Sequence, residues 1–233
     1  MANFVLVAGA WLGAWAWGEV VPALRAAGHG AHPLTLSGLA DRRGVAAGQQ
    51  THVADIVDQV ERLDLHDVVL VGHSYAGIPV GQAAELIGGR LARVVFVDSN
   101  VPEDGVSFTA GMSGGRQQAV EAAIAEAGGW WPPLTAADYV GEGLTEEQID
   151  WIVSGSTPHP GGSLTEPARL SGPLGALPGT YLKCLLDGPE PPPAAVEPLA
   201  SGAWRRVELD TGHWPMFSAP RALTRLLLDE AAR

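Results

Sequence analysis

The chain of 233 residues has little positive charge: 14 basic residues face 26 acidic ones, and Lys183 is the single lysine. A net charge of −12 repels phosphate backbones and anionic lipid surfaces, so we expect neither nucleic acid nor membrane as a partner. Cys184 is the only cysteine, which excludes an internal disulfide and a cysteine-based metal site. No hydrophobic run reaches the roughly 20 residues of a membrane span. Because the N-terminus lacks the basic region of a signal peptide, we expect a cytoplasmic protein.

The composition is that of a folded protein with a large core, since 46% of the residues are hydrophobic and 17% are charged. These values exclude a disordered chain and a small disulfide scaffold. The spacing of histidines and carboxylates matches no metal template, and no glycine-rich phosphate loop opens a helix. We therefore expect no metal and no cofactor, a small-molecule substrate as the partner, and a monomer or homodimer.

Short apolar segments alternate with amphipathic ones over the first hundred residues, which predicts an α/β fold whose mostly parallel sheet carries helices on both faces. The expected strands are residues 4–8, 31–36, 68–71 and 93–97, and the expected helices are residues 17–27, 51–63 (capped by Thr51) and 75–87.

Residues 102–178 break this alternation because they are rich in glycine, proline and tryptophan. We predict that they form an inserted lid, with helices at 117–127 and 145–153, on a core made of residues 1–101 and 179–233. The alternation resumes after the lid with expected strands at 180–186 and 205–209 and expected helices at 194–200 and 220–232.

Ser74 is the candidate nucleophile, because it lies in the segment GHSYAG (residues 72–77) between an expected strand and an expected helix. A serine on such a sharp turn needs small residues two positions before and after it, and glycine and alanine occupy those positions. The turn exposes the serine oxygen above the sheet. The N–H of Tyr75, at the start of the helix, can then donate to a developing oxyanion. We expect the second donor to be the N–H of Ala10, in the loop after the first strand.

His213 is the candidate base, since it follows the last expected strand and gives the order serine, acid, histidine. Asp187, at the end of strand 180–186, is the preferred acid, because the last strands usually supply it. Asp98, at the end of strand 93–97, is the alternative. The other six histidines, His73 among them, are expected to have surface or structural roles, although His159 is also a candidate for the pocket wall.

Tryptophan is frequent, with eight in the chain. Four of them fall beside the expected oxyanion loop, lid and histidine, where large aromatic side chains can bind an apolar acyl or aromatic group. With His159 they form the predicted substrate-binding set: Trp11, Trp130, Trp131 and Trp214.

Five segments carry a resemblance to known proteins: FVLVAGAWLGAWAW with LRAAGH at the start, LVGHSYAG around the serine, CLLD, TGHWPMFSAP around the histidine, and TPHP…TEPARL in the lid. They resemble the α/β-hydrolases of the plant methylesterase and hydroxynitrile lyase type and their bacterial esterase relatives, nearly end to end. The resemblance implies the α/β-hydrolase fold, a nucleophile, base and acid, and two backbone oxyanion donors, namely Ser74, His213, Asp187, Ala10 and Tyr75.

The chain also departs from that family. Ala8-Gly9 stands where the family's opening reads His-Gly, and Trp214 stands where the hydroxynitrile lyases carry a lysine after the base. Without that cation to hold cyanide, lyase chemistry is disfavoured.

The sequence thus predicts a serine hydrolase that cleaves a small, largely apolar carboxylic ester through an acyl-enzyme. Two alternatives remain open. The same fold could run cofactor-free lyase, cyclase or isomerase chemistry with His213 as general base, for which the altered Ala8-Gly9 loop is the support. It could also serve as a non-catalytic small-molecule receptor, against which the intact serine, histidine and acid argue.

Overall fold

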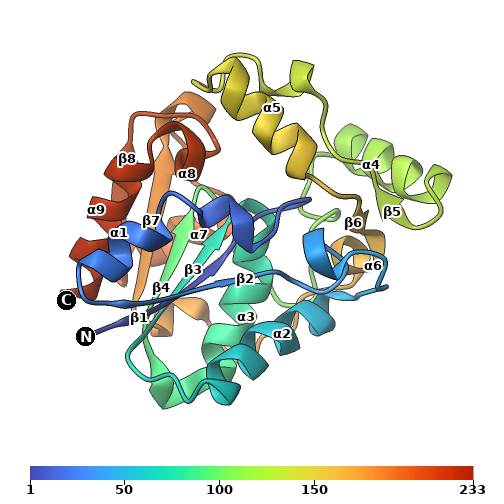
Figure 1. Ribbon diagram of the computed structural model, residues 1–233. Coiled ribbons are helices and arrows are strands. Elements are labelled where there is room, and N and C mark those ends of the chain that lie inside the picture. Colours follow the sequence, from blue (N-terminus) through green and yellow to red (C-terminus); the bar gives the residue numbers. More distant parts are fainter. Residues whose placement is uncertain (233) are drawn as a thin grey trace.

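A six-stranded parallel sheet organises the computed structural model, which describes residues 1–232 (Figure 1). Its strands are β1 (Asn3–Val7), β2 (Gly30–Leu34), β3 (Val68–His73), β4 (Leu91–Val97), β7 (Gly179–Cys184) and β8 (Trp204–Leu209). They lie in the order β2-β1-β3-β4-β7-β8, and each neighbouring pair is parallel. The predicted α/β-hydrolase sheet is therefore confirmed, with every expected strand present.

The sheet buries both faces under helices, as the apolar strands require. One core lies between the sheet and α2 (Gln49–Arg62), α3 (Gly77–Ile87) and α7 (Pro193–Ala200). The other lies between the sheet and α1 (Val21–Ala26), α8 (Pro215–Ser218) and α9 (Pro220–Ala231). Because successive side chains of a strand point to opposite faces, Val5 and Val7 of β1 join the first core, and Phe4 and Leu6 join the second.

Several helices begin at other residues than predicted, and two of these differences have a clear local cause. The helix expected at 17–27 is a short 3-10 helix, η1 (Ala14–Trp17), followed by α1, in which a proline occupies the first turn. Proline suits that position, because its missing N–H has no helical acceptor there. Thr51 does not occupy the N-cap of α2. Gly48 does, and its N–H donates to the Thr51 hydroxyl at 3.3 Å.

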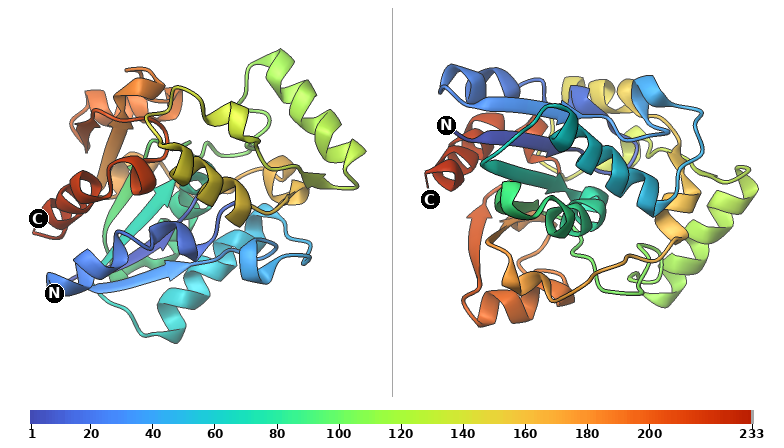
Figure 2. Two further views of the ribbon diagram at one scale, coloured as in Figure 1. Left: turned by 45° about the horizontal axis from the view of Figure 1, so that its top comes forward. Right: turned by 90° about the horizontal axis from the view of Figure 1, so that it is seen from below.

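The segment 102–178 contains α4 (Gly114–Glu126), α5 (Glu146–Gly155), α6 (Gly161–Thr165) and an antiparallel pair of short strands, β5 (Trp130–Trp131) and β6 (His159–Pro160). The two helices expected here correspond to α4 and α5, whereas α6, β5 and β6 were not predicted. Figures 1 and 2 show α4 and α5 on one side of the molecule and the two chain ends close together on another.

Short 3-10 helices fill several of the remaining connections: η2 (Ala40–Arg42), η4 (Gly88–Arg90), η5 (Ala136–Tyr139) and η6 (Leu174–Ala176). Among the described residues, none of the helices combines the length and the apolar character that crossing a bilayer would require.

Candidate active site

Ser74 lies at the sharp turn between β3 and the 3-10 helix η3 (Ser74–Ala76), which leads directly into α3. Its backbone φ of +54° is in the left-handed region, which side-chain-bearing residues seldom adopt outside special turns and functional sites. The loop after β1 passes so close that a Cβ added to Gly9 would lie 2.7 Å from the Ser74 Cβ. Glycine is therefore required at position 9 for this loop to reach the serine.

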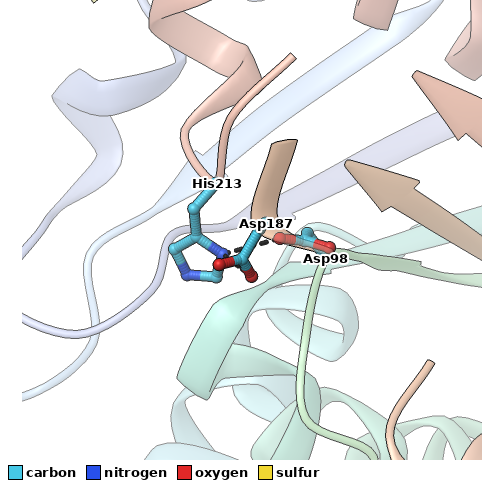
Figure 3. Close-up of side chains that lie close together, drawn as sticks. All are labelled: Asp98, Asp187 and His213. Carbon is cyan, nitrogen blue, oxygen red and sulfur yellow. Dashed lines mark hydrogen bonds and ion pairs between the residues drawn. The ribbon is translucent and has the colours of Figure 1, made fainter. Parts of the chain in front are cut away.

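His213 follows β8 and connects the serine to two carboxylates. Its Nε2 lies 2.9 Å from the Ser74 Oγ, and its Nδ1 lies 2.7 Å from the Asp98 Oδ2. The Asp187 Oδ2 is 3.4 Å from the same Nδ1 (Figure 3). Asp98 follows β4, and Asp187 ends the 3-10 helix η7 (Leu185–Asp187) after β7. Because β4 and β7 are parallel neighbours, both carboxylates come from the same edge of the sheet.

The structure thus brings Ser74, His213 and both candidate acids together, but the two acids differ in exposure and in their distance from His213. The side chain of Asp98 is 1% exposed and accepts the shorter contact from His213. The side chain of Asp187 is 45% exposed and lies farther away. The sequence favoured Asp187 as the acid, whereas this geometry favours Asp98.

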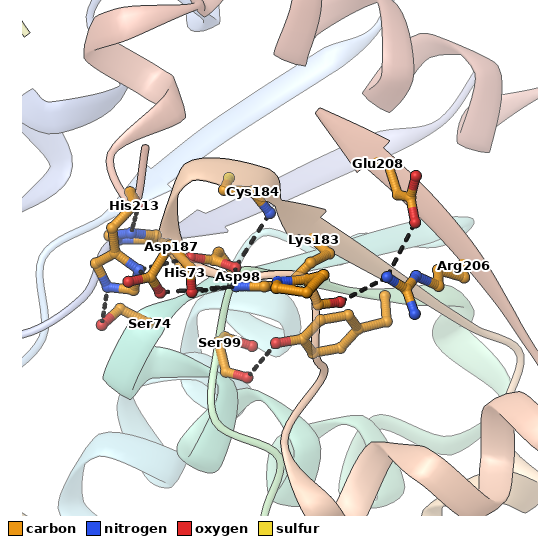
Figure 4. A network of polar contacts seen from close by, with 12 residues as sticks. His73, Ser74, Asp98, Ser99, Lys183, Cys184, Asp187, Arg206, Glu208 and His213 are labelled. Carbon is orange, nitrogen blue, oxygen red and sulfur yellow. Dashed lines mark hydrogen bonds and ion pairs between the residues drawn. The ribbon is translucent and has the colours of Figure 1, made fainter. Parts of the chain in front are cut away.

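Lys183, which the sequence reasoning missed, lies beside both carboxylates. Its Nζ is 2.5 Å from the Asp98 Oδ1 and 3.6 Å from the Asp187 Oδ2 (Figure 4). The Cys184 N–H donates to the same Asp98 Oδ1 at 3.1 Å. Two donors therefore occupy Oδ1 and leave Oδ2 for His213. The signal was available, because the only lysine of the chain stands inside an otherwise uncharged strand.

The two carboxylates make His213 a strong base. Burial by itself lowers the pKa of His213, but hydrogen bonding to Asp187 and Asp98 and their negative charges outweigh it and raise the pKa to about 9. In turn, the hydrogen bond with His213 holds the pKa of the Asp187 carboxyl well below its usual range. The arrangement therefore stabilises an imidazolium, the form that proton transfer from a serine would create.

The same three side chains also have the composition of a metal site. Ligand-type atoms of Asp98, Asp187 and His213 all lie within 4.8 Å of one another. The Lys183 ammonium, however, already supplies positive charge to both carboxylates. A divalent cation would be repelled by it, so this group does not fit a metal well.

The loop after β1, which is the expected oxyanion loop, places Ala10 at the wall of the cavity in front of Ser74, and the Ala10 N–H donates to no acceptor among the described residues. The preceding N–H, of Gly9, donates to the Nδ1 of His73 at 3.3 Å. The Nε2 of His73 in turn lies 2.7 Å from the backbone oxygen of His213. Burial, followed by the neighbouring His213, lowers the pKa of His73 to about 3, so its ring is neutral. His73 is therefore a structural link between the loop after β1 and the backbone of His213.

Tyr75, the other expected oxyanion donor, is buried in the first turn of η3, where N–H groups lack helical acceptors. Its hydroxyl oxygen lies 2.8 Å from the Nδ1 of His52, a second histidine buried behind the serine. Because the His52 Nε2 lies 2.8 Å from the Ser37 carbonyl oxygen and must donate to it, Nδ1 accepts the Tyr75 proton.

A cavity of about 660 Å³ lies in front of Ser74 and His213. Trp11, Trp131 and Trp214 line it, as expected, but Trp130 and His159 do not. Successive residues of a strand point to opposite sides, so Trp130 faces a separate hollow while its neighbour in β5 faces the cavity. His159 is fully buried behind the cavity wall and contacts the backbone of Trp11.

Part of the cavity wall comes from the segment 102–178, which supplies Phe108, Met112 and Leu134 as apolar lining residues. The same segment also holds His213, because the Glu142 carboxylate accepts the backbone N–H of His213 at 2.9 Å.

Comparison with known proteins gives a consistent picture. The model of the alpha/beta hydrolase family matches residues 4–226. A carbendazim hydrolyzing esterase from Nocardioides sp. (strain SG-4G) is 30% identical over 97% of this chain and 98% of its own length. The rice esterase PIR7B is 37% identical over 43% of this chain and 39% of its own, and an Arabidopsis alpha-hydroxynitrile lyase is 32% identical over 43% and 41%.

Solved structures agree on the fold. An extracellular alpha/beta-hydrolase from a Paenibacillus species superposes with a TM-score of 0.87 at 23% identity, covering 99% of both chains. The Arabidopsis methylesterase MES16 gives 0.71 at 18% identity, covering 100% of this chain and 99% of its own.

The predicted resemblance to plant methylesterases, hydroxynitrile lyases and bacterial esterases is confirmed by these matches. Most of the matched proteins are named esterases or hydrolases, which is consistent with a carboxylic ester hydrolase. With a family match over residues 4–226 and a relative at 30% identity along nearly its whole length, the chain belongs to the alpha/beta hydrolase family.

Proposed function

We propose that this protein is a serine hydrolase that cleaves a small, largely apolar carboxylic ester through a covalent acyl-enzyme. The observation that carries the proposal is the continuous chain of contacts from the Ser74 Oγ through the His213 imidazole to the Asp98 carboxylate, at 2.9 Å and 2.7 Å. A nucleophile, a base and an orienting acid within hydrogen-bonding distance are what acyl transfer needs.

In the first half-reaction the Ser74 Oγ attacks the ester carbonyl carbon while the His213 Nε2 takes the hydroxyl proton. Asp98 accepts the Nδ1 hydrogen and stabilises the imidazolium, and Asp187 adds a second negative charge nearby. The carbonyl oxygen becomes negative, and the N–H groups of Ala10 and Tyr75 donate to it. When the tetrahedral intermediate collapses, the imidazolium gives its proton to the departing alcohol oxygen.

In the second half-reaction a water molecule attacks the acyl carbon of the Ser74 ester. The His213 Nε2 takes the water proton and then returns a proton to the Ser74 oxygen as the carboxylic acid leaves. Apart from this water and the substrate, the proposed steps use side chains and backbone groups of the chain itself.

The aromatic part of the cavity wall supports the proposed substrate class. The aromatic rings of Trp11 and Trp131 lie 4.2 Å apart between centroids, and both face the cavity together with Phe108 and Met112. Such a wall gains from burying an apolar acyl or aromatic group, because transfer of apolar surface from water is worth roughly 25 cal/mol per Å². We also propose that the segment 102–178 is the lid that sets this specificity. Carbendazim is a further substrate to assay, because a relative is named for its hydrolysis.

The test is labelling with a fluorophosphonate probe and peptide mass mapping, followed by hydrolysis of p-nitrophenyl acetate and butyrate. We expect a stoichiometric adduct on Ser74 and turnover of both esters. Both should be lost in Ser74→Ala and kept in Ser154→Ala, which removes an exposed serine of α5. Folded protein that forms no adduct on Ser74 and shows no ester turnover dependent on Ser74 would favour the lyase or receptor alternatives.

A further inference from the structure

The backbone of Trp11 is held in an unusual conformation inside the oxyanion loop. Its φ is +66°, in the left-handed region that a bulky side chain seldom occupies. Such a conformation persists only where the surroundings fix it. The neighbouring Ala10 carries the free N–H that the proposed mechanism needs, so whatever fixes Trp11 also fixes that donor.

The start of β6 and the residues just before it make two hydrogen bonds to Trp11. The Trp11 N–H donates to the Nδ1 of His159 at 3.3 Å, and the Trp11 oxygen accepts the Thr157 N–H at 3.0 Å. The Thr157 hydroxyl also accepts the N–H of Ala40 at 2.9 Å, which ties this segment to the body of the protein. Both backbone groups of the strained residue are therefore bound by residues of the segment 102–178.

The tautomer of His159 follows from its other contact. The Ser163 hydroxyl donates to the carbonyl oxygen of Pro160 at 2.8 Å, so its oxygen must accept from the His159 Nε2, 2.9 Å away. The proton of the imidazole is thus on Nε2, and Nδ1 is an acceptor for the Trp11 N–H. Complete burial, and then the nearby His52, lower the pKa of His159 well below its ordinary value, which keeps the ring neutral.

A second neutral imidazole acts on the other side of Ala10. The Nε2 of His73 faces a carbonyl oxygen and must donate to it, so the His73 Nδ1 accepts the N–H of Gly9. The N–H groups before and after Ala10 are each taken by a histidine from a different part of the chain. The N–H of Ala10 is left alone between them, at the cavity wall.

We propose that His159 is a positioning residue: by binding the Trp11 N–H it fixes the oxyanion loop and directs the Ala10 N–H toward the substrate carbonyl oxygen. His159 does not touch the substrate, and its role rests on the proposed ester hydrolysis. The segment expected to cover the substrate therefore also sets the geometry of the catalytic donor. A donor displaced by about 1 Å typically lowers turnover by about a hundredfold.

Two substitutions of similar polarity separate this role from simple burial. In His159→Asn the side-chain oxygen lies close to the position of Nδ1 and can still accept the Trp11 N–H. In His159→Gln the amide reaches the position of Nε2, toward Ser163, and offers no acceptor to Trp11. Ile152→Val is the matched control, because it removes one buried methyl group from the same segment and no hydrogen bond to the loop.

With p-nitrophenyl acetate we expect kcat to fall about 10- to 100-fold in His159→Gln while KM changes less than about threefold, since the donor acts on the transition state. His159→Asn should keep kcat within about threefold of wild type, and Ile152→Val should match wild type. In the unaltered protein, amide hydrogen exchange measured by NMR should be slow at Trp11. In His159→Gln the exchange should be at least about tenfold faster.

Equal kcat values for the Gln and Asn variants would overturn the proposal. So would a freely exchanging Trp11 amide in the unaltered protein, a result that does not depend on any variant folding. Failure of the proposed function looks different: the unaltered protein then shows no ester hydrolysis that Ser74→Ala abolishes, whatever the exchange rate at Trp11.

Discussion

Replacing Asp98 by asparagine should disable the enzyme by placing the His213 proton on the wrong nitrogen. The Asp98 Oδ1 is surrounded by two donors, the Lys183 ammonium and the Cys184 N–H, so the amide oxygen of the new side chain must take that position. The amide NH₂ then faces the His213 Nδ1, 2.7 Å away, and makes it an acceptor. The proton moves to Nε2, which can no longer accept the Ser74 hydroxyl proton.

The expected cost is large for Asp98 and small for Asp187. A wrong tautomer in such a triad lowers kcat by about 10⁴-fold, or about 5.4 kcal/mol of barrier. Asp187 is half exposed and 3.4 Å from Nδ1, where a unit charge contributes about 1.2 kcal/mol at the dielectric of water, or about eightfold in rate. Asp187→Asn should therefore lose only about eightfold in rate, roughly a thousand times less than Asp98→Asn.

Steady-state hydrolysis of p-nitrophenyl butyrate at pH 8 measures both variants, with thermal unfolding as the check that each is folded. A reversed order, in which Asp187→Asn loses about 10⁴-fold and Asp98→Asn stays active, would refute this reasoning. It would assign the role of the acid to Asp187, as the resemblance to the methylesterases implied.

Three further predictions concern the base, the lysine and the pocket. Only the neutral His213 ring accepts a proton, and the pKa of His213 is raised to about 9, so kcat/KM should rise with pH until about pH 9. Asp187→Asn removes one of the carboxylates that raise this pKa, so the rise in kcat/KM should move to lower pH. Lys183→Met leaves a buried carboxylate without its cation, so urea unfolding should show a loss of about 3–5 kcal/mol and the kcat/KM profile should move to higher pH. Lys183→Met with unchanged stability and an unchanged profile would contradict the role given to the ammonium. Trp131→Ala should raise KM for p-nitrophenyl butyrate about tenfold, and Trp130→Ala should leave it unchanged, since only the Trp131 side chain faces the cavity. Equal changes of KM in the two variants would contradict this placement of the two side chains.

The sequence identified what depends on local structure. Ser74 stands in a turn whose small neighbours are required by sterics, and His213 stands in the loop after the last strand, so both could be found from short motifs. The positions of the six strands along the chain also followed from the alternation of apolar and amphipathic segments. The packing of the strands against one another could not be predicted from the sequence. Asp98 and Asp187 follow neighbouring strands, and their distances to the His213 Nδ1 differ by tenths of an ångström, so the sequence could not decide which of them is the acid.

The supporting residues could not be assigned because their partners are distant in the chain. His73 bonds to Gly9 and to the His213 backbone, and His159 bonds to Trp11, 148 residues away. Nothing in the sequence around a buried histidine indicates which distant residue its ring nitrogens bind. The two neighbouring tryptophans of β5 were expected in one pocket, although a strand must send them to opposite sides.

The order of strands has a consequence for synthesis on the ribosome. The first four strands lie side by side in the sheet as β2-β1-β3-β4 and come from the first 97 residues, but the outer edge of β4 is paired only by β7, which begins at Gly179. At roughly 5–20 residues per second, translation of the intervening residues 98–178 takes about 4–16 seconds. During that time the apolar residues Val94 to Val97 present unpaired N–H and C=O groups, the kind of edge that invites pairing with another chain. Nascent chains in which β7 is not yet synthesised are therefore open to misassembly with neighbouring chains. Changes that delay the synthesis or pairing of β7 should lower the yield of folded protein before they alter the folded structure.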